Sequence, residues 1–235
     1  DPDGQTRNME DSSERQSKRD LAADELRFVN GLSPGKILDV GCGTGAFLEG
    51  VQESWEKFGV ELSGFAAEVA GRYCNVFHGT LAEARFPDND FDVVILFHVI
   101  EHMKDPEKEL LEIRRVLKTG GTLVVGTPDF DSACARRYGE RFRLLHDQTH
   151  ISLFSEHSLQ LLLEDYGFEV VMTEYPFFET KYFKIENLER LFETKDMSPP
   201  FYGNIFSKFA IKISRDELIR KFESKIERVR AKVQD

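Results

Sequence analysis

The run FDVVILF at residues 91–97 restricts the fold of this chain more than any other segment. Six of its seven residues are apolar, so a strand built from it would turn apolar side chains toward both faces of a sheet. Strands of this kind are typical of parallel sheets that are covered by helices on both sides. The run therefore predicts a central strand of an α/β protein.

Strand and helix patterns alternate along the rest of the chain, which favours a doubly wound α/β fold. We expect a Rossmann-like, mostly parallel sheet of seven strands, the last antiparallel, at 37–40, 55–61, 75–78, 91–97, 122–127, 168–175 and 206–214. Helical patterns cover 13–30, 44–51, 63–73, 106–119, 155–166 and an amphipathic segment at 216–235. Asp105 is the expected N-cap of the 106–119 helix, and Gly120 is its expected stop.

Two connections, 128–154 and 176–206, are longer than is usual in a compact domain, and long connections tend to be functional. The second is rich in aromatic residues, which suits either a lid over an apolar or ring-shaped acceptor, or a small satellite core or dimer contact. We divide the chain into an N-terminal tail and helix (1–30), one α/β domain (31–215) that contains both connections, and a C-terminal helix (216–235).

Charge and composition argue against several classes of partner. The net charge of −11 would repel a nucleic-acid backbone. The longest apolar run is too short to cross a bilayer, and the N-terminal residues lack the apolar core of a secretion signal. Three cysteines, an odd number without metal-ligand spacing, indicate free thiols in a reducing compartment. We therefore expect a cytoplasmic protein with neither a nucleic-acid nor a membrane partner.

A glycine-rich turn, GCGTGA at 41–46, follows the first expected strand and loosely matches a dinucleotide-binding fingerprint. It suits either the diphosphate of a dinucleotide or the amino-acid end of S-adenosylmethionine. Asp39, just before the turn, would repel a diphosphate but would stabilise the ammonium and sulfonium of S-adenosylmethionine. Glu61 ends the second strand, where an acid can bind the ribose hydroxyls of either cofactor. Asp39 therefore favours S-adenosylmethionine, with an NAD-dependent oxidoreductase as the alternative.

Four segments in order, ILDVGCGTGAFL, GVELS, FDVVILFHVIEHMKDP and LKTGGTLVVGTP, resemble the successive motifs of class I S-adenosylmethionine-dependent methyltransferases. The resemblance covers about residues 37–176. The later segment HISLFSEHSLQLLLEDYGFEVV resembles the branch that includes quinone-biosynthesis and sugar or polysaccharide O-methyltransferases. The resemblance as a whole implies that 31–215 is a methyltransferase domain, with acceptor-site or lid segments at 128–154 and 176–206.

The resemblance also implies which residues bind the cofactor. The methionine end would be held by Asp39, Gly41, Cys42, Gly43, Thr44 and Gly45. Glu61 would bind the ribose and Leu62 the adenine, while Thr80 and Leu81 stand where the family has an acid and a small residue near the adenine amine. Thr80 departs from that pattern, because a hydroxyl accepts this hydrogen bond less strongly than a carboxylate. Phe97 and His98 would border the methyl group and the acceptor. His102 would either fix its loop by hydrogen bonding or contact the cofactor.

Histidines are the expected bases, because methyl transfer to an alcohol or phenol benefits from a group that takes the proton. His98 follows a strand at its carboxyl end, where open α/β sheets bind ligands. His146 and His150 lie in the first long connection, which could fold over the acceptor. Their H-x3-H spacing also suits a metal on a helix, but neither need be helical and no third ligand is evident, so we expect no metal.

The sequence thus predicts an S-adenosylmethionine-dependent methyltransferase of small-molecule biosynthesis, with His98, His146 and His150 as catalytic candidates. The acceptor would be a sugar, a glycan precursor or a quinone-like phenol, methylated at oxygen. A homodimer is an open possibility. Besides the oxidoreductase, a non-catalytic module that binds S-adenosylmethionine is an alternative.

Overall fold

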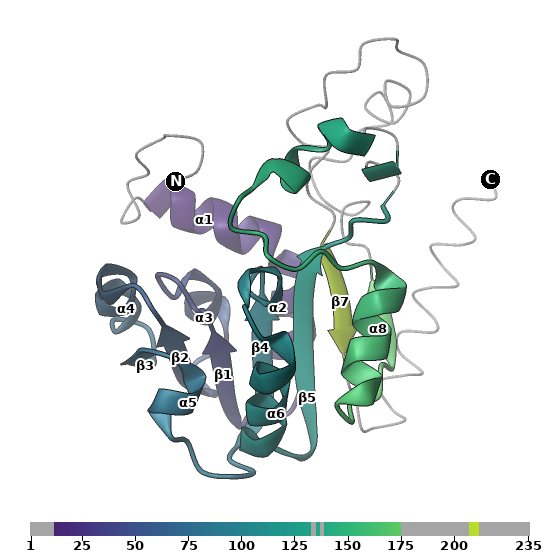
Figure 1. Cartoon of the computed structure of the whole chain (residues 1–235). Coiled ribbons are helices and arrows are strands. Elements are labelled where there is room, and N and C mark those ends of the chain that lie inside the picture. Colours follow the sequence, from purple (N-terminus) through teal and green to yellow (C-terminus); the bar gives the residue numbers. More distant parts are fainter. Residues whose placement is uncertain (1–11, 133–134, 137–138, 175–206, 212–235) are drawn as a thin grey trace, which may run out of the picture.

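The computed structural model describes residues 12–132, 135–136, 139–174 and 207–211. Within them one sheet of seven strands has the order β3-β2-β1-β4-β5-β7-β6 (Figure 1). Its strands are β1 (Lys36–Val40), β2 (Glu56–Glu61), β3 (Asn75–His78), β4 (Phe91–Phe97), β5 (Leu117–Pro128), β6 (Met172–Glu174) and β7 (Ser207–Ile211). The first five strands are parallel to one another, and β7 is antiparallel to both β5 and β6. The expected mostly parallel fold with an antiparallel last strand is confirmed.

Helices cover both faces of this sheet (Figure 1). They are α1 (Ser12–Leu21), α2 (Ala23–Asn30), α3 (Ala46–Gly50), α4 (Gly64–Ala70), α5 (Leu81–Ala84), α6 (Pro106–Val116) and α8 (Glu156–Asp165). Alternate residues of β1 enter two separate cores: Leu38 packs with the helices α5, α6 and α8, whereas Ile37 packs with α2 and α3. This alternation is the reason that a near-continuous apolar strand is stable here, since water reaches neither face.

Helix boundaries follow from capping side chains that the sequence already contains. Asp105 accepts a hydrogen bond from the backbone N–H of Lys108 at 3.1 Å and caps α6, with Pro106 in the first turn. Ser155 caps α8 in the same way, accepting from the Ser158 N–H. The prediction that Gly120 ends α6 was wrong. The helix ends at Val116, and the chain is extended from Leu117, where β5 begins.

Other expected elements differ in extent. The 13–30 helix is divided into α1 and α2. Of the expected 168–175 strand, the described part (168–174) is extended in the sheet only over the three residues of β6. The short helix α5 was not expected; Thr80 and Glu83 form a capping box that starts it. The expected lid at 176–206 and the helix at 216–235 lie outside the described residues. No helix in the described ranges combines the length and apolar content needed to cross a membrane.

The carboxyl ends of β1, β2 and β4 meet at one edge of the sheet. The glycine turn follows β1, and the short 3-10 helix η1 (Ile100–His102) follows β4. The connection after β5, with the 3-10 helices η2 (Gly139–Arg141) and η3 (Arg143–His146), lies above this edge together with α1 (Figure 1). This is the edge at which open α/β sheets bind ligands.

Candidate cofactor and acceptor site

The glycine turn between β1 and α3 has three residues in the left-handed backbone region. Gly41, Gly43 and Gly45 have φ of 75°, 53° and 75°, which residues with a Cβ adopt at a cost. A Cβ on Gly41 would lie 2.6 Å from Val99, and one on Gly45 would lie 3.2 Å from the backbone of Ala70. A Cβ on Gly43 would meet no atom within 4 Å. Two of the glycines therefore allow close packing, whereas Gly43 borders open space at the carboxyl edge.

Two carboxylates flank this turn in different environments. Asp39 is buried, and this burial, followed by the nearby Cys74 thiol and Glu61 carboxylate, raises the pKa of its carboxyl well above the ordinary value. Glu61, at the end of β2, accepts hydrogen bonds from the Gly43 N–H at 2.9 Å and the Ser63 N–H at 2.8 Å. The apoprotein thus holds one carboxyl that is costly to ionise and one that already fixes the turn.

The other expected cofactor residues divide by exposure. Leu62 is 70% exposed beside Glu61, as an adenine contact requires. Leu81 has its side chain in the core, and the Thr80 hydroxyl donates to Glu83 at 2.8 Å within the capping box. The Cys42 side chain is buried, with its sulfur close to Gly59. Contacts from Cys42 and Leu81 to a cofactor would therefore come from the backbone.

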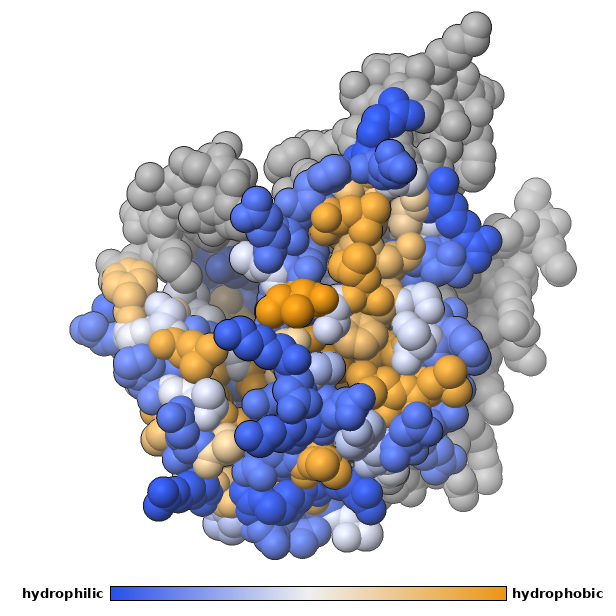
Figure 2. All heavy atoms as spheres, viewed as in Figure 1, coloured by the Kyte–Doolittle hydropathy of each residue, from blue (hydrophilic) through white to orange (hydrophobic). Residues whose placement is uncertain are grey.

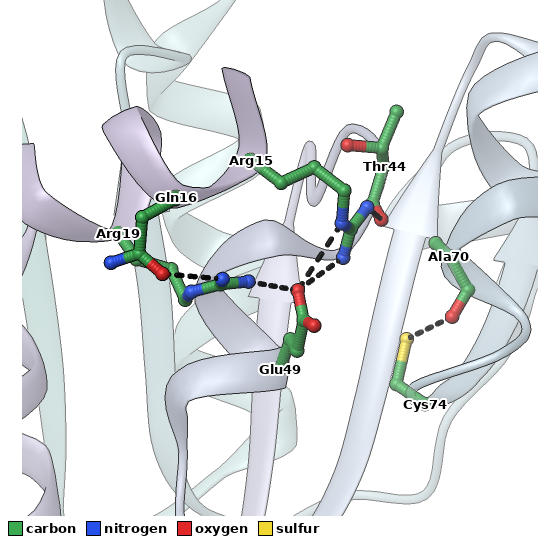
Figure 3. A network of polar contacts seen from close by, with 7 residues as sticks. All are labelled: Arg15, Gln16, Arg19, Thr44, Glu49, Ala70 and Cys74. Carbon is green, nitrogen blue, oxygen red and sulfur yellow. Dashed lines mark hydrogen bonds and ion pairs between the residues drawn. The ribbon is translucent and has the colours of Figure 1, made fainter. Parts of the chain in front are cut away.

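Arg15 on α1 reaches the glycine turn, a contact that the sequence did not indicate (Figure 3). Its guanidinium donates to the backbone carbonyl of Thr44 at 2.7 Å and to Glu49 at 2.6 Å, and stacks over the Tyr73 ring at 4.2 Å. Arg19 pairs with the same Glu49 carboxylate. Thr44 and Glu49 lie 29 and 34 residues from Arg15 in the sequence, and Tyr73 lies farther still, so periodicity carried no signal for these contacts.

We expect Arg15→Ala to lower the free energy of unfolding by about 1–3 kcal/mol, because the substitution removes a buried charged donor from two acceptors. It should also weaken binding of a cofactor at the turn, since the Thr44 carbonyl loses its anchor to α1. Urea unfolding and calorimetry measure the two effects. Arg136→Ala, which removes an exposed ion pair with Asp131, is the control and should leave both the stability and the cofactor affinity unchanged.

His98 directly follows β4. Its backbone is in the left-handed region, with φ of 53°, and its side chain is 55% exposed. Its Nδ1 lies 3.4 Å from Oε1 of the buried Glu101. Burial alone would raise the pKa of the Glu101 carboxyl, but the His98 imidazole and the Thr127 hydroxyl hold it below its ordinary value overall. The next residue, Val99, packs on Gly41 of the glycine turn. The backbone strain at His98 is of the kind that gathers at functional sites.

The other three candidate histidines, His102, His146 and His150, occupy different places. Nδ1 of His102 lies 2.8 Å from the Thr149 carbonyl, Nδ1 of His150 lies 2.9 Å from the Leu144 carbonyl, and the two rings are 4.9 Å apart. His146 is exposed, and its Nε2 bonds to the Glu140 carbonyl at 2.6 Å. The fold therefore groups His150 with His102 and Glu101 rather than with His146, although His146 is four residues away in sequence.

A family model described as "Methyltransferase domain" matches residues 13–173, which is more than half of the chain. This chain belongs to that methyltransferase family. The match spans the glycine turn, Glu61, His98 and the connection after β5. The expected family and its cofactor, S-adenosylmethionine, are confirmed, and the NAD-dependent alternative is not supported by this membership.

Individual relatives agree with this assignment. An O-methyltransferase, cnsE, of Penicillium expansum is 33% identical over 210 residues, covering 78% of this chain and 70% of its own. An uncharacterised methyltransferase of Schizosaccharomyces pombe is 36% identical over 137 residues, covering 50% and 49%. A Thermotoga maritima structure titled as an S-adenosylmethionine-dependent, possible histamine N-methyltransferase has a TM-score of 0.54 and 30% identity, covering 68% and 78%. The matched part of this chain spans about half the length of the fission yeast relative.

A substitution in the glycine turn can test cofactor binding separately from folding. We expect Gly43→Ala to weaken S-adenosylmethionine binding by 10-fold or more, because the new methyl group enters the open space beside the turn. Because alanine disfavours the left-handed backbone conformation of this position, the substitution should also lower the free energy of unfolding by about 1–2 kcal/mol. Gly139→Ala is a matched control: Gly139 has φ of 51° and also has no atom within 4 Å of a built Cβ. It should lose similar stability and keep the wild-type affinity in calorimetry.

Proposed function

We propose that this chain transfers the methyl group of S-adenosylmethionine to a hydroxyl oxygen of a small molecule. The observation that carries the proposal is the contact between the glycine turn and the end of β4: Val99 packs on Gly41, and its neighbour His98 is exposed beside that turn. A cofactor in the turn and a base on β4 thereby share one edge of the sheet. The Penicillium O-methyltransferase, which matches most of both chains, supports oxygen as the acceptor atom.

The cofactor contacts follow from the turn and its flanking carboxylates. In this proposal the methionine end lies against the backbone of residues 41–45, with its ammonium toward Asp39. The ribose hydroxyls donate to Glu61, whose oxygens can accept further hydrogen bonds beside those from the two backbone N–H groups. The adenine lies against Leu62, near the backbone of Thr80 and Leu81. Phe97 and His98 border the methyl group and the acceptor, and His102, whose Nδ1 is bonded to the Thr149 carbonyl, is a further candidate cofactor contact.

The chemistry is a displacement at carbon. The acceptor oxygen attacks the methyl carbon as the carbon–sulfur bond breaks, its electron pair passes to sulfur, and S-adenosylhomocysteine leaves. The hydroxyl proton passes to Nε2 of His98, since Nδ1 faces Glu101 at 3.4 Å. The buried carboxylate of Glu101 then stabilises the imidazolium and holds the orientation of its ring, so Glu101 acts as a positioning residue.

An acceptor with an apolar or ring-shaped part suits the surroundings. The connection after β5 exposes Leu145, Ile151 and Leu153. Figure 2 shows apolar side chains gathered on this side of the molecule, from the connection down toward α8. A quinone-like phenol fits such a surface better than a bare sugar. The net charge of −11 argues against a polyanionic acceptor.

The test is incubation of the full chain with methyl-labelled S-adenosylmethionine and a panel of catechols, other phenols and sugars. Label recovered as an ether on one phenol class supports the proposal. Label on nitrogen or carbon would contradict the acceptor atom. Tight cofactor binding without transfer to any acceptor would instead support a non-catalytic module, and His98→Ala would then have no consequence for any measured activity.

The domain division is part of the same proposal. We propose 31–215 as the catalytic unit, with 128–154 and 176–206 at the acceptor, and 216–235 as an amphipathic helix that packs on this domain or on a second copy. Truncation after residue 215 followed by light scattering tests the last point. A dimer that becomes a monomer supports packing on a second copy, and an unchanged oligomeric state supports packing on the same domain.

A further inference from the structure

Three potential metal ligands from two separate segments meet beside β4. Glu101 and His102 belong to η1, and His150 lies at the end of the connection after β5. The segments are joined by two backbone hydrogen bonds, because the N–H groups of Ile151 and Ser152 donate to the Glu101 carbonyl at 2.8 and 3.0 Å. One ligand atom from each of Glu101, His102 and His150 lies within 4.8 Å of the other two. We refer to these three residues as the Glu–His cluster.

The two imidazoles are oriented so that their Nε2 atoms are available as ligands. Nδ1 of His102 faces the Thr149 carbonyl, and Nδ1 of His150 faces the Leu144 carbonyl. Since a carbonyl oxygen can only accept, each Nδ1 carries the proton, and the neutral ring has its lone pair on Nε2. Donation of the second ring nitrogen to a backbone carbonyl is the usual support of a metal-binding histidine.

The Glu101 carboxylate supplies the third ligand atom. Its side chain is 1% exposed, and Oε2 accepts from the Thr127 hydroxyl at 2.9 Å. Oε1 is buried and accepts no hydrogen bond from the described part of the chain; Nδ1 of His98 is 3.4 Å away and Nε2 of His102 4.0 Å away. Nδ1 of His98 approaches this oxygen only at 3.4 Å, so Oε1 keeps the capacity to bind a cation beside its contact with the His98 imidazole.

We propose that the Glu–His cluster binds one Zn²⁺ ion through Oε1 of Glu101 and Nε2 of His102 and His150. Two imidazoles and one carboxylate form a ligand set that zinc accepts with further positions open, whereas Mg²⁺ prefers oxygen ligands. Zinc bonds of about 2.0–2.2 Å bring ligand atoms to roughly 3.3 Å from one another, so small side-chain rotations would close the site. Oδ2 of Asp147, 3.9 Å from Nε2 of His150, is close enough to join.

This site would lie at the edge of the sheet where the acceptor is proposed to bind. Open positions on the ion would take water or an oxygen of the acceptor. Metal binding by the cluster does not depend on methyl transfer, so it is tested without cofactor and without acceptor. A failure of one proposal therefore leaves the other standing.

The experiment is calorimetric titration of the chelator-treated full chain with zinc chloride. We expect one Zn²⁺ per chain, and a loss of affinity of about 100-fold or more in His150→Ala and in Glu101→Gln. His146→Ala is the matched control, because it removes an exposed histidine of the same connection that is not in the cluster, and it should bind zinc as the wild type does. Circular dichroism and S-adenosylmethionine affinity show whether each variant is folded.

Cobalt(II) gives a second measurement on the wild-type chain, which is decisive even if a variant does not fold. A d–d absorption spectrum without a thiolate charge-transfer band supports nitrogen and oxygen ligands. A charge-transfer band would assign the metal to the cysteines and overturn the proposal. No zinc binding, or binding that is the same in wild type, His150→Ala and Glu101→Gln, would overturn it as well.

Discussion

Asp39→Asn is expected to bind S-adenosylmethionine about 10- to 100-fold more weakly than the wild type, yet to unfold at a higher temperature without cofactor. Asp39 is buried, and its pKa is raised well above the ordinary value, first by burial and then by Cys74 and Glu61. Its ionised form is therefore unfavourable in the apoprotein and needs a cation. The ammonium of the cofactor would supply one, and losing that pairing corresponds to about 1.4–2.8 kcal/mol.

The pH dependence of stability follows from the same raised pKa. Below the ordinary carboxyl pKa, Asp39 is protonated in both the folded and the unfolded state, so wild type and Asp39→Asn should have similar stability. As the pH rises from there to the raised folded-state pKa, the unfolded state ionises more readily and the wild type loses stability. The amide does not titrate, so the advantage of Asp39→Asn should grow across this interval. Thermal unfolding of both apoproteins over a pH series measures it.

Proton release provides the sharpest test of Asp39. In the interval between the two pKa values, binding of the cofactor ammonium should ionise Asp39 and release a proton to the buffer. Calorimetry in buffers of different ionisation enthalpy detects this proton, which should disappear in Asp39→Asn. Glu53→Gln is the matched control, because the Glu53 side chain is 95% exposed, and it should bind cofactor as the wild type does. Unchanged affinity in Asp39→Asn would contradict the assigned role.

His98→Ala is expected to slow methyl transfer about 10²- to 10⁴-fold while S-adenosylmethionine binds nearly as before. The loss should fall on kcat, because the imidazole acts on the proton of the bound acceptor. Added imidazole should restore part of the rate, which a merely structural role for His98 would not allow. Glu101→Gln should also lower kcat, but less, since the ring of His98 would remain and only its charged partner at 3.4 Å would be lost.

Single-turnover kinetics with the acceptor identified by the panel would measure these rates. His146→Ala is the control and tests a competing assignment, because both histidines were candidates from sequence. Full activity in His98→Ala together with a large loss in His146→Ala would transfer the role of base to the connection after β5. Equal small losses in both would show that transfer proceeds without a protein base.

Much of the fold could be predicted from the sequence, because hydrophobic patterns and helix-capping residues act locally and indicate the same elements that the structure contains. The apolar run at 91–97 could be stable only inside a covered parallel sheet, and it forms β4 within those bounds. Asp105 and Pro106 gave the start of α6 for local reasons of capping. The end of α6 was predicted wrongly. A glycine such as Gly120 only allows a helix to end, whereas the pairing of Leu117 with Phe91 in the sheet decides where the chain becomes extended.

The glycine turn, with Asp39 before it and Glu61 ending the next strand, was determined by the sequence itself, since these features depend on the backbone of one strand, one turn and the neighbouring strand. Only the tertiary structure decided which distant groups meet there. It brought Arg15 to the Thr44 carbonyl, placed His150 against His102 instead of beside His146, and buried Glu101 near both rings. Such contacts join residues that are about 30 to 50 positions apart. No periodicity encodes them, because they arise from the packing of whole elements over the carboxyl edge of the sheet.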